Sequence, residues 1–397
     1  MSLRRAEARE TLSRDRGFRS KAVAMTDSTP FEIFLVAPPG LEPVLQQEVA
    51  EAGFADPVAV PGGVTIQGGW PDVWRANLEL RGATRVLARL GSFMAFHLAQ
   101  LDKRARKFPW AEILRPDMPV RVEVTTNKRS KIYHAGAAAQ RIERALAETL
   151  GAPISAEAAL CVKVRIDDNR VLLSLDTSGE SLHKRGHKEA VGKAPMRETL
   201  AALFLRQCGF DGTMPVLDPM CGSGTFVIEA AERAAGLAPG RSRSFAFMDL
   251  ANFDAGLWDE MRAAQPAARP TDLLFRGSDR DAGAIRMAQA NAARAGVAEQ
   301  TDFTMHALSD LPRPDGPPGL IMVNPPYGAR IGNKKLLFGL YGALGQTLLA
   351  RFSGWRVGIV TSETGLARAT GLPFLPTTPS VPHGGLKVTL FRTDPLP

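Results

Sequence analysis

Hydrophobic and polar positions in the first quarter of the chain follow the periods of short strands and helices. An alternating stretch at 31–37 predicts a strand, the apolar spacing over 41–52 predicts a helix, and 58–67 predicts a hairpin around a Pro-Gly-Gly turn. A second helix is predicted over 74–90. This β-α-β-β-α order is typical of a ferredoxin-like sandwich, so we expect an N-terminal unit over residues 29–100.

A second α+β unit is predicted over residues 101–190. Residues 120–126 alternate as a strand, and a basic loop separates them from a strongly helical pattern at 135–150 that ends before a glycine. Residues 161–176 predict a hairpin around Asp-Asp-Asn.

From about residue 195 onward, strands alternate with helices, which is the signature of a doubly wound α/β sheet. We place this Rossmann-like domain at 191–397, with an inserted loop at 239–270. The final strand follows a His-Gly-Gly turn closely, so it is expected to pair antiparallel. The predicted strands are 215–217, 272–277, 301–305, 320–323, 355–361 and 386–391, and the predicted helices are 198–207, 225–235, 282–295 and 336–352.

The composition is that of a globular protein without a membrane anchor. Hydrophobic residues make up 45% and charged residues 23% of the chain, and no apolar run reaches the ~18 residues that span a bilayer. Residues 1–24 carry seven Lys and Arg but also acids and no apolar core, so they fail as a secretory signal. We expect 1–28 to be a disordered basic extension.

Cysteine and histidine usage gives no sign of a disulfide or a metal site. The three cysteines have no paired spacing, and the six histidines have no ligand spacing. We therefore expect a cytoplasmic protein without a bound metal.

The charge is unevenly distributed and points to a polyanionic partner. The formal net charge is +8 and the isoelectric point is about 9.6. Residues 101–193 alone hold eighteen Lys and Arg against twelve Asp and Glu. Basic residues concentrated in one region favour a nucleic acid as the partner.

A glycine turn early in the α/β domain predicts a nucleotide-like cofactor. Asp218 and Pro219 follow a strand, Gly222 and Gly224 form the turn, and a helix starts at Thr225. Glycines let the backbone approach a ligand, and a helix N-terminus presents free N–H groups. A plain strand-to-helix turn or an NAD site gives the same pattern.

The spacing of acidic residues separates these alternatives. A dinucleotide fold places an acid roughly 20 residues after the turn. Here the next strand-end acids are Asp279 and Asp281, more than fifty residues on. We therefore prefer S-adenosylmethionine, with Asp279 accepting its ribose hydroxyls and Asp281 serving as a helix N-cap.

The run Asn324-Pro325-Pro326-Tyr327 closes an apolar strand and suits an amine on an aromatic ring. The lone pair of such an amine is delocalised, so it needs orientation. The Asn324 side-chain oxygen and the Pro325 carbonyl can accept its two N–H groups, and the rings of Pro325 and Pro326 hold these acceptors rigidly. Tyr327 can stack on the base. The alternative is a simple Pro-Pro turn with Tyr327 as packing.

These stretches resemble the THUMP-domain class I RNA methyltransferases, specifically the large-subunit ribosomal RNA guanine-N2 methyltransferases. The resemblance covers residues 31–395 and runs in order along the chain. The matching stretches are Gly40–Leu45, Leu182–Gly186 with Ala194–Ala202, Asp218–Gly224, Asn324–Gly328 and Leu340–Gly345.

The resemblance implies S-adenosylmethionine as donor, a guanine N2 amine as acceptor and RNA delivery by the N-terminal units. Two positions depart from the family. His306 and Ala307 stand where the family places an acid for the adenine amino group, and His187 stands where it has an aromatic residue. For RNA contact we name six basic residues: Lys128, Arg129, Lys131, Lys184, Arg185 and Lys188.

Three other functions remain open on the sequence. Transfer RNA could replace ribosomal RNA, because related proteins with a similar N-terminal module modify it. Adenine N6 or a protein glutamine amide could replace guanine N2, because both suit the same Asn-Pro-Pro-Tyr geometry. The third alternative is an inactive methyltransferase fold that serves only to bind RNA.

Overall fold

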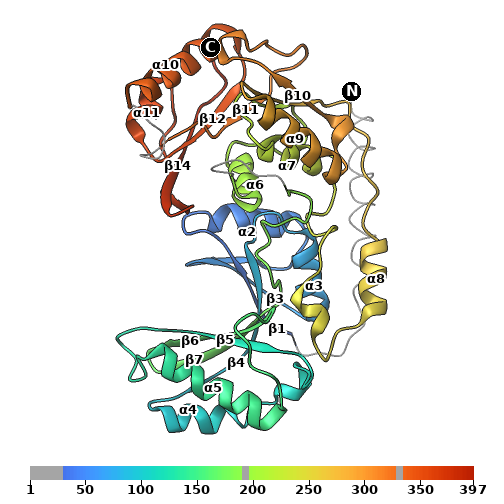
Figure 1. Cartoon of the computed structure of the whole chain (residues 1–397), viewed down its shortest axis with the longest axis vertical. Helices are drawn as coiled ribbons and strands as arrows, with labels where there is room; N and C mark the ends of the chain where they lie inside the picture. Colours follow the sequence, from blue (N-terminus) through green and yellow to red (C-terminus); the bar gives the residue numbers. More distant parts are fainter. Residues whose placement is uncertain (1–29, 190–195, 328–333) are drawn as a thin grey trace, which may run out of the picture.

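Two seven-stranded sheets form the framework of the computed structural model, which describes residues 30–189, 196–327 and 334–397. The C-terminal sheet lies at one end of an elongated molecule, the ferredoxin-like unit in the middle and the second α+β unit at the other end (Figure 1). The predicted α/β class with an α+β N-terminal half is confirmed.

The first unit has the βαββαβ order of a ferredoxin-like sandwich, with strand order β2-β3-β1-β4. The strands are β1 (Phe31–Val36), β2 (Val58–Val60), β3 (Gly63–Gly68) and β4 (Arg85–Met94), and the helices are α2 (Glu42–Glu51) and α3 (Trp70–Glu79). The helix predicted over 74–90 is wrong in its second half, which is strand β4. Leu80 already has extended backbone, and β4 pairs with β1 on one side and β7 on the other.

Strand β4 joins the two N-terminal units into one sheet. Its first residues pair with β1, and after a bulge at Arg89–Gly91 it continues along β7. The sheet then runs β7 (Arg170–Asp176), β6 (Leu160–Asp167) and β5 (Val120–Thr126), with α4 (Leu98–Ala105) and α5 (Ala135–Leu150) packed together beside it. The two units predicted on either side of residue 100 therefore share one continuous sheet.

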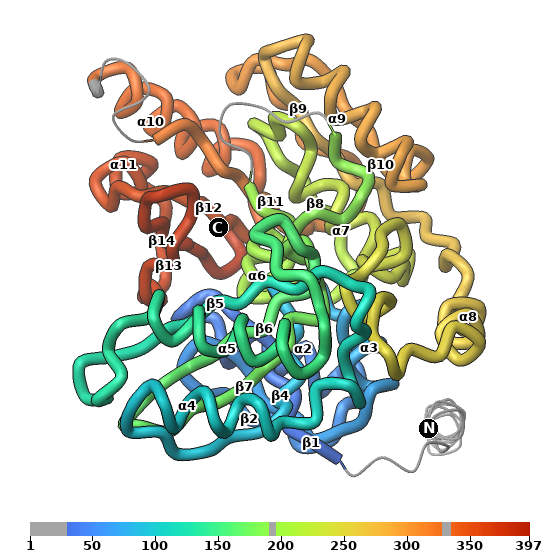
Figure 2. The backbone as a smooth tube through the Cα atoms, turned by 60° about the horizontal axis from the view of Figure 1, so that its bottom comes forward, coloured from blue at the N-terminus to red at the C-terminus, as the bar shows by residue number. Residues whose placement is uncertain are grey.

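The C-terminal sheet has the order β10-β9-β8-β11-β12-β14-β13, and its strands follow one another across Figure 2. The first five are parallel, and β14 is antiparallel to β12 as predicted. The strands are β8 (Val216–Asp218), β9 (Phe275–Asp279), β10 (Thr301–Met305), β11 (Leu320–Val323), β12 (Arg356–Thr361), β13 (Val381–His383) and β14 (Leu386–Arg392). The helices are α6 (Glu198–Gln207), α7 (Thr225–Ala234), α8 (Ala255–Ala263), α9 (Ala282–Ala295), α10 (Lys334–Arg351) and α11 (Thr364–Ala369).

The segment 239–270, expected to be an inserted loop, contains α8 and packs on the N-terminal half. In Figure 1, α8 lies beside α3. Phe247 stacks on Trp74 of α3 at 5.9 Å between ring centroids and meets Trp258 of α8 edge-on at 5.1 Å. The Phe247 N–H also donates to the Thr177 carbonyl at 3.0 Å. Together, the helix, ring contacts and hydrogen bond make this segment a clasp between the two halves.

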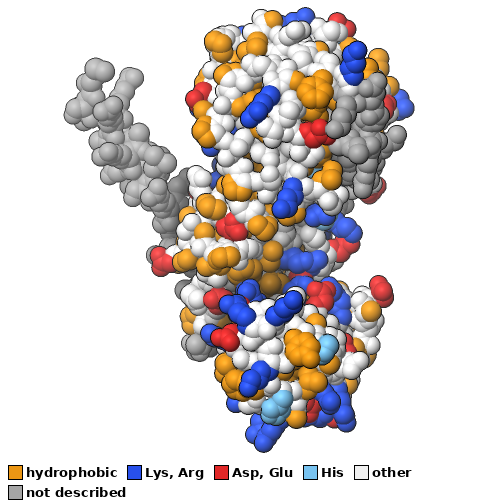
Figure 3. Space-filling view, turned by 90° about the vertical axis from the view of Figure 1, so that its left-hand side faces the viewer, with side chains coloured by type: hydrophobic (Ala, Val, Ile, Leu, Met, Phe, Trp, Pro, Cys, Tyr) orange, Lys and Arg blue, Asp and Glu red, His pale blue; other side chains and the backbone are white. Residues whose placement is uncertain are grey.

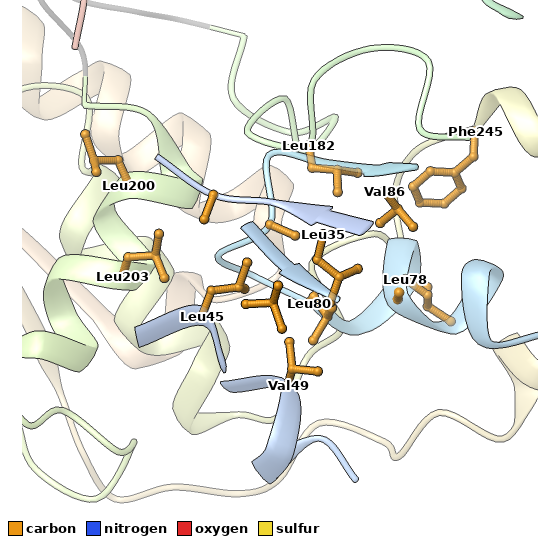
Figure 4. Close-up of a cluster of buried hydrophobic side chains, with 14 of the residues drawn as sticks. Leu35, Leu45, Val49, Leu78, Leu80, Val86, Leu182, Leu200, Leu203 and Phe245 are labelled. Atoms are coloured by element: carbon orange, nitrogen blue, oxygen red, sulfur yellow. The ribbon is translucent and has the colours of Figure 1, made fainter. Parts of the chain in front are cut away.

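The hydrophobic core runs across the same junction without a break. Figure 4 shows Leu45 and Val49 of α2 on one side and Leu200 and Leu203 of α6 on the other. All four are 2% exposed or less. Burial on this scale makes a rigid connection between the ferredoxin-like unit and the C-terminal domain.

A buried ionic network crosses the junction as well. Arg81, which follows α3, contacts Glu229 at 2.7 Å and Glu232 at 3.4 Å, both on α7. Arg185 contacts Glu229 at 3.2 Å, and the His187 ring contacts Glu232 at 3.2 Å. Burial by itself would raise the pKa of Glu229, but Arg185 and Arg81 outweigh it and hold that pKa below its ordinary value.

Among the described residues, no helix has the length and apolar character needed to cross a bilayer. Cys161, Cys208 and Cys221 are buried free thiols.

Candidate active site

The glycine turn lies where the order of the C-terminal sheet reverses. β8 pairs with β9 on one side and β11 on the other, and ligands of open α/β sheets bind at the carboxyl ends of such strands. Gly222 and Gly224 have φ of +51° and +84°, which favour glycine. A Cβ on Gly224 would come within 3.1 Å of Ala288 and the Phe303 ring. Thr225 then begins α7.

Two carboxylates flank this turn. Asp218 is 2% exposed, and its Oδ1 accepts from the Met220 N–H at 3.0 Å. Burial, with a smaller contribution from the charge of Asp279, raises its pKa to about 8 despite the lowering effect of the Met220 hydrogen bond. Asp279 accepts from the Gly222 N–H at 3.1 Å. Pro219 is buried between Asp218 and the turn. A ligand that carries positive charge would be stabilised here.

The carboxyl ends of β9 and β10 supply the neighbouring groups. Asp281 caps α9, and its side chain accepts from the Gly283 N–H at 2.7 Å, as predicted. The His306 N–H donates to the Asp279 carbonyl at 3.2 Å, and the exposed Ala307 precedes a single 3₁₀ turn. His306 and Ala307 therefore lie at the same edge as Asp279, whereas Asp310 is exposed at the end of that 3₁₀ turn.

Asn324 follows β11 directly, and β11 is the parallel neighbour of β8. Asn324 and Asp218 therefore lie at the same edge of the sheet. The Asn324 Oδ1 is buried and has no hydrogen-bond partner among the described residues. Next to it, the buried Tyr341 donates its hydroxyl to the Pro326 carbonyl at 3.4 Å, which helps fix the turn. The turn thus holds a buried acceptor without a donor, an arrangement that is costly unless a ligand supplies one.

A cavity of about 1500 Å³ opens in front of Asn324–Tyr327. Its other walls come from both halves of the chain: parts of the segments 178–188, 196–198 and 242–249, and the turn at 383–386. Figure 3 shows hydrophobic side chains gathered at the waist of the molecule, with Lys and Arg around it. Lys188 and Glu198 line the cavity, and Lys188 touches Thr225 at the start of α7, so the cavity adjoins the glycine turn.

Comparisons with known proteins identify the family. Residues 185–374 match the model described as "RMKL-like, methyltransferase domain", and residues 32–87 match "RlmL ferredoxin-like domain". A putative RNA methyltransferase of Synechocystis is 30% identical over 365 residues, which cover 89% of this chain and 94% of that relative. The chain belongs to the RMKL-like RNA methyltransferase family.

Two further proteins bear on this methyltransferase. The ribosomal RNA large subunit methyltransferase K/L of Vibrio campbellii is 34% identical over 338 residues, which are 82% of this chain but 48% of that relative, so the chain spans about half its length. The solved structure of SMU.472, a putative methyltransferase complexed with SAH, has a TM-score of 0.82 and 26% identity, and the match covers 93% of this chain and 99% of that one. The predicted family and its class of cofactor are confirmed.

Four of the six basic residues named for RNA contact lie on the surface of this methyltransferase. Lys128, Arg129 and Lys131 are on the exposed loop between β5 and α5. The Arg129 guanidinium pairs with Asp167 at 2.6 Å but remains 72% exposed. Lys184 is exposed, pairs with Glu180 at 2.5 Å and lines the cavity. These four side chains can reach a phosphate.

Arg185 and Lys188 are used inside the protein, so we correct the prediction that they contact RNA. Arg185 is 2% exposed within the ionic network of α7. The Lys188 ammonium contacts Glu198 at 2.9 Å and donates to the Thr225 hydroxyl at 2.8 Å and the Met196 carbonyl at 3.0 Å. Their acidic partners come from other segments, so the local charge run could not reveal this burial.

Several residues that line the cavity were not named as site residues from the sequence. Arg243 donates hydrogen bonds to the carbonyls of Ser178, Ser181, Lys184 and Glu180 and so folds the junction around its guanidinium. The others are His183, Arg197 and His383. His183 and Arg197 lie in stretches that carry the family resemblance, and His383 lies in the turn before the last strand, but nothing in the sequence marked these side chains individually.

Proposed function

We propose that this chain methylates the exocyclic N2 amine of a guanine in RNA, with large-subunit ribosomal RNA as substrate and S-adenosylmethionine as methyl donor. The observation that carries the proposal is the buried, unpartnered Oδ1 of Asn324 at the carboxyl edge of the sheet, in a residue that lines a cavity of about 1500 Å³. A guanine N2 amine has two N–H groups that such acceptors would hold.

The turn at 218–225 fits the cofactor. Its glycines leave room for close approach, and the N-terminus of α7 offers free N–H groups. Asp218 and Asp279 place two carboxyl groups at neighbouring strand ends, and a positively charged ligand would favour the ionised form of Asp218. When bound, S-adenosylmethionine supplies an electrophilic methyl group on a positively charged sulfur. Of the two acids, Asp279 would hold the ribose hydroxyls.

The chemistry of the chain's own residues is orientation. Asn324 Oδ1 and the Pro325 carbonyl would accept the two N–H bonds and turn the nitrogen lone pair toward the methyl group. Tyr327, half-buried between the two hydrophobic clusters, would support the base. The oriented amine would accept the methyl group that the cofactor supplies and would give up one proton to solvent.

The cations around the cavity support RNA over a protein substrate. Lys184, Arg197 and Arg243 line it, and Lys128, Arg129 and Lys131 extend the basic surface to the far end of the N-terminal half. A phosphate backbone gains from such charges, whereas a glutamine side chain does not need them.

Methyl-labelled S-adenosylmethionine and under-methylated total RNA, separated into ribosomal and transfer fractions, test the proposal. After digestion to nucleosides, label is expected in N2-methylguanosine from large-subunit RNA, and Asn324→Ala provides the background. Label in transfer RNA would overturn the substrate, label in methyladenosine would overturn the base, and no label in any fraction would favour an RNA-binding protein without activity.

A further inference from the structure

One histidine in the cavity has a ring nitrogen that nothing in the described chain uses. His383 ends β13, just before the Gly384-Gly385 turn, whose φ values are +57° and +83°. The residue is 8% exposed and lines the cavity together with Asn324–Tyr327. Its Nδ1 is buried without a hydrogen-bond partner among the described residues. Two residues that line the cavity, Asn324 after β11 and His383 at the end of β13, therefore each carry a buried polar atom without a partner among the described residues.

The surroundings keep the ring uncharged. Burial lowers the pKa of His383 first, and the positive charges of Arg197 and Lys188 lower it further. His183, on the junction side of the cavity, has its pKa lowered to about 4 by burial and then by Arg197, Arg185, Lys184 and Lys188. The same two cations, Arg197 and Lys188, act on both rings. Both histidines are therefore neutral at physiological pH.

Neutral imidazole suits a base better than a phosphate. A phosphate is served by the cations that already line this cavity, whereas a flat uncharged ring with one free nitrogen can stack on a nucleobase and hydrogen-bond to its edge. Enzymes that modify a base hold it in this way, by contacts to its edge and stacking on its faces. The cavity thus divides into cations that can meet the backbone and neutral groups that can meet the base.

We propose that His383 contacts the base presented to Asn324 and reads its edge through the ring nitrogen, which makes the β13–β14 turn part of the substrate site. The inference rests on the proposed function for the identity of the target as a nucleobase in RNA. His383 belongs to the specificity of the reaction, and Asn324 to the orientation of the amine.

Two substitutions separate a base contact from a packing role. His383→Phe keeps a ring of similar shape but removes both nitrogens, and His383→Asn restores a polar group near the position of Nδ1. We expect His383→Phe to lower kcat/KM for RNA about tenfold, which corresponds to one lost hydrogen bond, with unchanged affinity for S-adenosylmethionine. We expect His383→Asn to recover part of that loss.

A wild-type kcat/KM in His383→Phe would overturn the inference. Equal losses in both variants together with weaker cofactor binding would also overturn it, because that pattern marks a structural residue. The labelled nucleoside made by the wild-type enzyme reports separately on the proposed function. If it is methyladenosine, the guanine proposal fails while the contrast between the two variants still tests His383 on that product. RNA affinity measured with S-adenosylhomocysteine gives a second readout that does not need turnover.

Discussion

Asn324 is the residue on which the proposed chemistry depends most directly, since its side-chain oxygen has no other partner in the described chain. Asn324→Ala removes the acceptor that would orient the amine. We expect methyl transfer to fall by about 10²- to 10³-fold, the typical loss for one oriented polar group, with cofactor affinity within a factor of about two of wild type. Single-turnover rates and cofactor titration measure the two effects, and a variant with more than a tenth of wild-type activity would contradict the assigned role.

The raised pKa of Asp218 makes the stability of the folded protein depend on pH. Because its pKa is raised to about 8 in the folded protein, the native state holds this proton more tightly than the unfolded chain. The contribution of Asp218 to stability is therefore present at low pH and is lost as the pH rises from about 4 through 8. We expect Asp218→Asn to gain stability relative to wild type as the pH is raised across that window. Thermal unfolding of both proteins without ligand, at a series of pH values, measures this difference.

Cofactor binding provides the control for this effect. Positive charge beside Asp218 favours its ionised form, so saturating S-adenosylmethionine should flatten the pH dependence of the wild-type protein and leave that of Asp218→Asn less changed. Parallel pH curves for the two proteins without ligand would refute the explanation.

At the scale of elements, α7 connects the glycine turn to the packing of the two halves. Its N-terminus carries Gly224 and Thr225, and its body carries Glu229 and Glu232, which meet Arg81 across the junction. The clasp at 239–270 closes the same junction with aromatic rings. A disturbance at this junction should therefore affect the position of the turn as well as stability.

Arg81→Met tests this connection. It leaves buried carboxylates with fewer partners, and breaking such a buried pair costs about 3–5 kcal/mol of unfolding free energy. Arg144→Met is the matched control, because Arg144 and Glu148 form an exposed pair on α5 and its loss should change stability little. Denaturant unfolding of both variants measures the difference, and equal effects would show that the buried network adds nothing to the junction.

At the scale of the whole molecule, the basic loop lies far from Asn324, whereas Asn324 itself lines the cavity (Figure 1). The loop with Lys128, Arg129 and Lys131 belongs to the second α+β unit, at the end of the molecule opposite the C-terminal sheet (Figure 1). Helices α2 and α3 and the clasp pack the ferredoxin-like unit against the C-terminal domain. RNA bound at the opposite end of the molecule would therefore be held at a fixed distance from Asn324.

Replacing Lys128, Arg129 and Lys131 with Gln should weaken RNA binding and flatten its dependence on salt. Each phosphate contact adds about 0.7–0.9 to the slope of log affinity against log salt, so the slope should fall by up to about 2–3. Arg313 and Arg368, exposed in the C-terminal half and outside the cavity, provide the control when both are changed to Gln. An unchanged slope in the triple variant, measured by RNA titration at several salt concentrations, would remove this loop from the RNA surface.

The sequence by itself determined the elements whose patterns are long and whose ends carry their own signals. Helix α5 has the predicted bounds because its apolar spacing is regular and Gly151 ends it with a left-handed backbone at φ of +82°. Motif order also placed Asp218, Gly222 and Asn324 at strand ends of one sheet, since residues that follow neighbouring parallel strands meet at one edge. For this reason the fold class and the placement of these residues at one edge of the sheet were predictable together.

Only the tertiary structure decided the features that depend on distant partners. Strand β4 has a short apolar run that suits a helix or a strand equally. Its pairing with β1 and β7 makes it a strand. Arg185 and Lys188 look like surface charges until Glu229 and Glu198 are folded against them. The cavity is lined by both His183, from the junction, and His383, from the end of β13, and no local pattern encodes this arrangement because the packing of the two halves creates it.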